Sequence, residues 1–170
     1  MRKEQSIVAV GAATGVISMI IGVFSVYRAW PVPQGLAAAA ERVAYTLQWE
    51  AIAALTLLVA VIAVGNNRFL SEAIDPTLNK EDLATQINGR VVENTLQQLV
   101  LFVLGTLALS VGLAPEQMGI IPATVIVFVI ARIAFWIGYR VHPLYRAFGM
   151  AATGYLNVGL LGFAIAKMVA

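Results

Sequence analysis

Long runs of apolar residues dominate the chain, and short polar stretches separate them. A helix that crosses a membrane needs about 20 mostly apolar residues, and five segments meet this requirement. They are Ser6 to Tyr27, Val43 to Val64, Ile87 to Leu113, Gly119 to Tyr139 and Ala147 to Met168. These runs are too long, and alternate too little between apolar and polar residues, for the strands of a membrane barrel. The pattern therefore predicts five transmembrane helices.

The expected connections are polar or contain proline and glycine. They are Trp30 to Gly35, Asn66 to Gln86, Ala114 to Gln117 and Arg140 to Arg146. The basic start of the chain resembles that of a signal peptide, but the apolar core of a signal peptide has only about 7–15 residues. We therefore expect the first segment to remain as a membrane span.

Composition supports a membrane protein and excludes several other classes. Of the 170 residues, 60% are hydrophobic and 12% are charged, whereas a soluble domain has about 45–50% apolar and about 25% charged residues. This excludes a soluble domain and a disordered chain. The net charge of +2 is too small for a nucleic-acid-binding surface. Cysteine is absent and histidine occurs once, at position 142, so we predict no metal site.

Basic residues between the spans predict the orientation, because lysine and arginine concentrate on the cytoplasmic side. With the N-terminus inside, the inner side holds Arg2, Lys3, Arg68, Lys80, Arg90, Arg140 and Arg146. The outer side then holds Arg28, Arg42 and Lys167. We therefore expect a cytoplasmic N-terminus and an external C-terminus, in a membrane of the bacterial inner-membrane type.

Polar side chains at membrane depth are costly, so they are candidates for function. In the third expected helix, Arg90, Asn94 and Gln97 lie on one stripe, at i, i+4 and i+7. A second stripe, in the fourth helix, consists of Arg132, Phe135, Trp136 and Tyr139. Both stripes lie toward the same side of the membrane. Guanidinium, amide and phenol groups at matching depth predict a cleft for an anionic, hydrogen-bonding ligand.

Each of these residues also has a purely structural interpretation. Arg90 could pair with Glu93 or Asp82 at the membrane edge, and Arg132 could pair with Glu93 across the bundle. The positions of Trp136, Tyr139 and Arg140 would also fit the aromatic and basic residues that commonly anchor a helix at the membrane–water interface.

Three further features favour structural roles. Glu50 lies in the outer half of its helix, where we expect a buried polar partner or a protonated carboxyl rather than catalysis. His142 precedes a proline in a connection and is expected to be exposed. Small residues recur in the first helix at Gly11, Gly15, Ser18, Gly22 and Ser25, which predicts a close-packing face.

Two motifs resemble those of the MAPEG family, the membrane-associated proteins of eicosanoid and glutathione metabolism. The stretch from Arg90 to Gln98 is similar to that family's R-x-x-x-N-x-x-E motif, and the stretch from Ala131 to Tyr139 is similar to its A-R-x-x-Y-x-x-G-Y motif. The resemblance covers about Val43 to the C-terminus. It implies an all-α integral membrane protein with a four-helix transmembrane bundle at residues 43–170. An additional N-terminal transmembrane helix and its loop would occupy residues 1–42.

The resemblance also implies a homotrimer that binds glutathione, as co-substrate, between subunits near the cytoplasmic face. A lipophilic small molecule would enter from the bilayer. By position, the glutathione-binding residues would be Arg90, Asn94, Gln97, Arg132 and Tyr139. An arginine after the fourth helix would stabilise the thiolate, and the spacing leaves both Arg140 and Arg146 as candidates.

Two positions depart from the family motifs and leave more than one function open. Gln97 replaces the acidic residue of the first motif, and Phe135 replaces the first tyrosine of the second. The leading hypothesis is a glutathione-dependent transferase or peroxidase that acts on lipophilic electrophiles or lipid hydroperoxides. The alternative is a non-catalytic family member that binds a lipid or a partner protein. A transporter or channel is a third possibility, although no pair of broken helices supports it.

Overall fold

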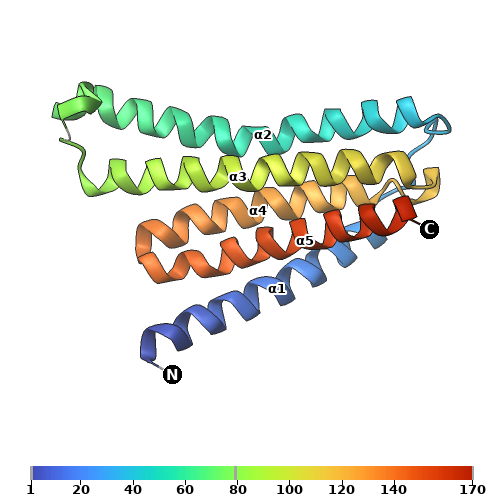
Figure 1. Cartoon of the computed structure of the whole chain (residues 1–170), viewed down its shortest axis with the longest axis horizontal. Coiled ribbons are helices and arrows are strands. Elements are labelled where there is room, and N and C mark those ends of the chain that lie inside the picture. Colours follow the sequence, from blue (N-terminus) through green and yellow to red (C-terminus); the bar gives the residue numbers. More distant parts are fainter. Residues whose placement is uncertain (1, 79, 170) are drawn as a thin grey trace.

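Five long helices form one bundle in the computed structural model, which describes residues 2–78 and 80–169. They are α1 (Lys3–Ala29), α2 (Ala39–Phe69), α3 (Leu83–Gly112), α4 (Ile120–Val141) and α5 (Ala147–Val169). The helices run side by side with alternating directions (Figure 1), and the described residues contain no strand. All five helices are long and apolar enough to cross a membrane. The predicted fold class and the five spans are therefore confirmed.

The connection between α2 and α3 is shorter than the sequence pattern suggested. Both helices continue past the apolar runs, to 31 and 30 residues, so their ends project beyond α4 and α5 (Figure 1). Hydropathy marks only the part of a helix that lies in lipid, whereas capping determines where the helix ends. The Asp82 side chain accepts a hydrogen bond from the Thr85 amide at 2.8 Å and starts α3. An ion pair between Arg68 and Glu81, at 2.6 Å, ties the two helix ends together.

The first helix packs on α5 and α4 through its glycines. Gly15 is buried, and a Cβ there would collide with the backbone carbonyl of Phe148. A Cβ at Gly22 would lie 3.1 Å from the Val127 side chain. The close-packing face is therefore confirmed for the glycines, whereas Ser18 and Ser25 are exposed. The contact therefore uses fewer residues than predicted, and the glycines alone allow the backbone of α1 to approach the neighbouring helices closely.

The carboxyl of Glu50 is buried between α2 and α3, as the sequence predicted. The Glu50 side chain is 5% exposed, and its Oε1 lies 2.6 Å from the Thr106 hydroxyl. The same hydroxyl lies 2.8 Å from the Phe102 carbonyl oxygen. A hydroxyl has one proton to donate, so a protonated Glu50 that donates to Thr106 would satisfy both contacts.

His142 is exposed, again as predicted.

We expect Thr106→Val to destabilise the protein by about 1–3 kcal/mol, because the buried carboxyl loses its partner. Glu50→Gln keeps a donor toward Thr106 and should cost less. Thr56→Val is the matched control, since within the described residues the Thr56 hydroxyl bonds only to the Ala53 carbonyl of its own helix. Thermal unfolding of the three variants in detergent measures the difference. Equal midpoints for Thr106→Val and Thr56→Val would contradict this account of the Glu50 contact.

Candidate functional site

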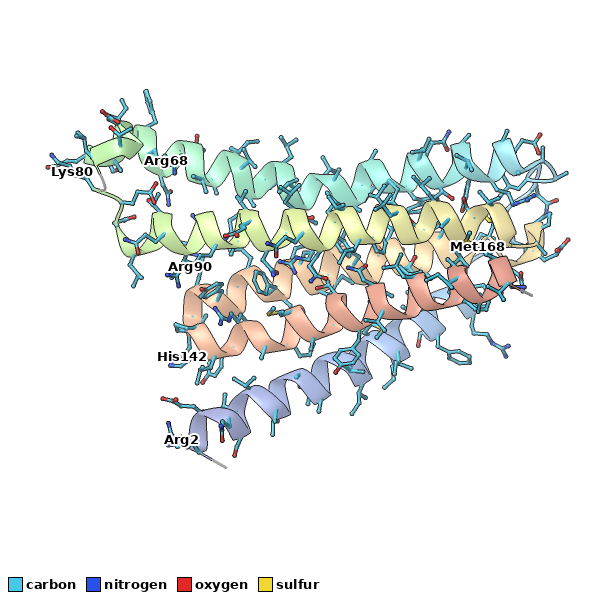
Figure 2. All side chains as sticks on the ribbon, in the orientation of Figure 1. Arg2, Arg68, Lys80, Arg90, His142 and Met168 are labelled. Carbon is cyan, nitrogen blue, oxygen red and sulfur yellow. The ribbon has the colours of Figure 1, made fainter. Side chains whose placement is uncertain are left out.

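Basic side chains gather at the end of the bundle where α1 and α5 begin and α4 ends. Figure 2 shows Arg2, Arg68, Lys80, Arg90 and His142 at this end, which we call the arginine-rich end, and Met168 at the other. Within residues 2–78 and 80–169, the only ion pairs are Arg68–Glu81 and Lys80–Glu72. The remaining cations of this end therefore have no carboxylate partner in the described structure.

Two of these cations, Arg90 and Arg146, contact Tyr139. Its side chain is buried, and its hydroxyl oxygen accepts hydrogen bonds from Arg90 Nη1 at 3.3 Å and Arg146 Nη1 at 2.9 Å. The Arg146 guanidinium also lies over the Tyr139 ring, 4.9 Å from its centroid. Residues of α3, α4 and the connection to α5 thus converge on one phenol. The phenol keeps its own proton for donation to a ligand.

The turn between α4 and α5 places Arg146 beside Tyr139. Pro143 opens a short 3-10 helix, Pro143–Arg146, which continues directly into α5. The His142 side chain caps this turn by accepting a hydrogen bond from the Leu144 amide. Gly138 permits the close return of the chain, because a Cβ there would lie 2.8 Å from the Tyr145 carbonyl oxygen. The turn therefore folds back onto the last turn of α4.

Arg132 forms a second, buried group of hydrogen bonds, about two helical turns before Tyr139 on α4. We call the Tyr139 and Arg132 groups together the arginine cluster. The Arg132 side chain is 2% exposed, and Nη2 donates to Asn94 Oδ1 and Thr95 Oγ1, both at 3.0 Å. Nη1 donates to Thr153 Oγ1 at 3.2 Å, and the guanidinium lies 4.1 Å from the Phe135 ring centroid. These contacts join α3, α4 and α5 and fix the position of the Asn94 amide.

Two partners of Arg132, Thr95 and Thr153, were missed by the sequence analysis. A threonine in an apolar helix commonly bonds to its own backbone, so neither residue gave a distinctive signal. The ion pairs considered for the arginines do not form. Arg90 and Arg132 bond to neutral groups, Glu93 is exposed, and Asp82 caps α3.

The remaining candidates lie outside the arginine cluster. Gln97 is exposed on α3 and Arg140 is exposed at the end of α4, and neither side chain forms a hydrogen bond within the described part of the chain. The Trp136 indole nitrogen donates to the buried Asn88 Oδ1 at 2.8 Å. Of the two arginines after α4's tyrosine, only Arg146 bonds to Tyr139.

An apolar cavity of about 220 Å³ flanks Arg132 on the side of α2. The cavity lies between α2, α3 and α4, and its lining includes Leu55, Val59, Val91, Ile133, Trp136 and Arg132. Several of these apolar side chains, such as Leu55 and Val59, are about half exposed. The cavity is therefore open at the side of the bundle that would face lipid.

One comparison with known proteins gives a match. The sequence model of the MAPEG family matches residues 46–166, a range that includes the whole arginine cluster and leaves α1 outside. No curated protein matches the chain, and no solved structure does.

Proposed function

The chain belongs to the MAPEG family, and we propose that it is a glutathione-dependent transferase or peroxidase that acts on lipophilic electrophiles or lipid hydroperoxides. The family contains glutathione transferases and peroxidases as well as non-catalytic members. Family membership and the five apolar helices identify an integral membrane protein. The choice of a glutathione enzyme within the family is the proposal.

The absence of carboxylate partners around Arg90, Arg132 and Arg146, within the described residues, carries this proposal. Glutathione has two carboxylates, and guanidinium groups bind carboxylates through paired, charge-assisted hydrogen bonds. Arg90 and Arg146 are exposed, and each donates one hydrogen bond to Tyr139. Their other N–H groups are therefore available to a ligand, and the chemistry of the cluster fits glutathione.

We assign to Arg146 the role of stabilising the thiolate of glutathione. A nearby guanidinium favours the thiolate, which is the reactive nucleophile. In a transferase reaction the thiol proton leaves, the thiolate sulfur bonds to the electrophilic carbon, and a leaving group such as chloride departs from that carbon with its bonding electrons. In a peroxidase reaction the sulfur attacks a peroxide oxygen, which breaks the O–O bond and releases an alcohol. A second glutathione then reduces the sulfenic acid, giving glutathione disulfide and water.

The surroundings of the cluster suit a lipophilic partner. The cavity beside Arg132 is lined largely by apolar side chains and lies among helices that would contact lipid. An apolar electrophile concentrates in a bilayer and would reach this cavity from the side. We therefore assign the apolar reactant to the side of α2 and glutathione to the side of Tyr139.

We also propose that a homotrimer completes the site. Arg90, Gln97, Leu104 and Val111 are exposed on α3 at seven-residue intervals, a spacing typical of helices that pack together. Glu93 is exposed on the same face. Polar side chains at membrane depth favour contact with protein over lipid, so this face fits a neighbouring subunit. Gln97 would then lie at the boundary between two subunits.

The excess of basic residues at the arginine-rich end supports a cytoplasmic position for that end. The N-terminus would be cytoplasmic and the C-terminus external. Glutathione would then enter the cluster from the cytosol.

The test is turnover by the purified full chain in detergent and in liposomes. We expect conjugation of glutathione to 1-chloro-2,4-dinitrobenzene, or reduction of a lipid hydroperoxide with formation of glutathione disulfide. A protein that does neither, although it is folded and trimeric, would contradict the proposal.

Gln97 and Phe135 favour a second candidate, a non-catalytic member that binds a lipid. Gln97 supplies no negative charge for the ammonium group of glutathione, and the Phe135 ring packs on Arg132 instead of offering a hydroxyl. Native mass spectrometry would then show a retained lipid and no binding of glutathione. An empty protein with conjugating activity would exclude this candidate.

We expect Gln97→Glu to strengthen glutathione binding about two- to five-fold, the range of an exposed ion pair. The new carboxylate would face the ammonium group of glutathione and supply a negative charge that Gln97 does not. Isothermal titration measures the gain. The matched control is the glutathione analogue without the ammonium group, whose affinity should not rise. An equal gain for both ligands would contradict this placement of Gln97.

A further inference from the structure

An apolar groove of about 400 Å³ separates α1 from α5 in the half of the bundle away from the arginine-rich end. Its walls include Met19, Val23 and Tyr27 of α1 and Tyr155, Gly159 and Phe163 of α5. Eight residues of helix rise about 12 Å, so each wall leads from mid-bilayer toward the surface. Since α1 lies outside residues 46–166, the family match includes the α5 wall of this groove but not its α1 wall.

At the surface end of the groove, a basic side chain lies over an aromatic ring of each wall. The Arg28 guanidinium lies 5.6 Å from the ring centroid of Phe24, which lines the α1 wall. Lys167 Nζ lies 5.7 Å from the ring centroid of Phe163 on the α5 wall. Both basic residues are exposed, and within the described residues neither forms an ion pair or a hydrogen bond through its side chain.

The other charged groups at this end are already occupied or do not neutralise these cations. The Arg42 guanidinium donates to backbone carbonyls at the end of α3 and in the preceding loop. The Glu41 carboxylate accepts from the Ala38 amide. Glu116 lines a neighbouring cavity together with Arg28, but no ion pair joins them. The free positive charge at this end therefore lies beside the aromatic residues Phe24 and Phe163 that line the groove.

We propose that the groove holds one acyl chain of an anionic phospholipid, whose phosphate is bound by Arg28 and Lys167. Apolar walls suit the chain, and basic residues near a membrane surface attract anionic lipids. The groove runs from mid-bilayer to the surface, which is the path of an acyl chain below its headgroup. This lipid site does not depend on the proposed glutathione chemistry.

The test is native mass spectrometry of the full chain, reconstituted with either phosphatidylglycerol or phosphatidylcholine. Two cations near the surface correspond to about 30-fold tighter binding of phosphatidylglycerol than of phosphatidylcholine. The double variant Arg28→Gln, Lys167→Gln should bind both lipids equally. Equal binding of the two lipids by the natural chain would overturn the proposal, as would an undiminished preference in the double variant.

A second pair of variants tests the groove itself. Gly159 lines the groove, and in the described part of the chain no atom beyond its own stretch of helix lies within 4 Å of an added Cβ. Gly159→Phe should therefore fill the groove and remove the bound lipid. Gly162→Phe is the matched control, because Gly162 is equally open but does not line the groove. Thermal unfolding would verify that both variants are folded. Equal lipid retention by the two variants would place the lipid elsewhere and overturn the proposal.

Discussion

Arg146→Gln is expected to lower kcat/KM for glutathione conjugation about 100-fold, the size of effect seen when one donor to a developing negative charge is removed. Arg146 is the arginine of the α4–α5 turn that bonds to Tyr139, at 2.9 Å. Its loss would remove the cation that favours the thiolate. The substitution leaves the protein core untouched, because the Arg146 side chain is exposed.

Arg140→Gln is the matched control for this prediction. Both arginines are exposed and close in sequence, but Arg140 makes no hydrogen bond within the described residues. We expect its loss to change kcat/KM by less than about two-fold, as for a surface charge. Steady-state assays at saturating electrophile compare the two variants. Equal losses would show that net positive charge matters, and not the position of Arg146.

Gly149→Ala is expected to destabilise the protein by about 3 kcal/mol, at the upper end of ordinary overpacking. Gly149 lies where α5 meets α4. An added Cβ there would collide with the Ala131 carbonyl oxygen and lie 2.5 Å from the Phe135 amide nitrogen. Backbone atoms cannot rotate away as a side chain does, so the two helices would have to separate. Because Ala131 and Phe135 flank Arg132 along α4, activity should fall as well.

Gly154→Ala tests whether this cost comes from the contact. Gly154 lies on the same helix, and among residues 2–78 and 80–169 no atom outside its own stretch of helix lies within 4 Å of an added Cβ. Alanine favours a helix over glycine by about 1 kcal/mol, so this variant should be as stable as the natural chain or slightly more stable. Thermal unfolding in detergent gives both values. A Gly149→Ala variant as stable as Gly154→Ala would contradict the close packing of α4 and α5.

The fold could be predicted from the sequence because a bilayer imposes a simple rule on length and polarity. The five apolar runs correspond to α1 to α5, and the two motifs on α3 and α4 indicate the family that the sequence model matches. The ends of the helices were harder to predict from the sequence, because α2 and α3 continue through polar residues beyond the apolar runs. Capping at Asp82, and not hydropathy, sets the start of α3.

The candidate site could be predicted only in part. Helical spacing placed Arg90 and Asn94 on one stripe, and the structure brings them to Tyr139 and Arg132 respectively. Spacing along a helix does not reveal which residue of another helix completes a contact. For this reason Thr153 was missed, and the choice between Arg140 and Arg146 needed the fold of the α4–α5 turn.

The central claim, that Arg146 stabilises a glutathione thiolate beside Tyr139, is tested most directly by ultraviolet absorbance of the thiolate. The purified full chain is mixed with glutathione in the absence of an electrophile. We predict a thiolate signal that saturates with glutathione concentration, persists in Arg140→Gln and is lost in Arg146→Gln. No signal from the natural chain, or an equal signal from Arg146→Gln, would contradict the claim.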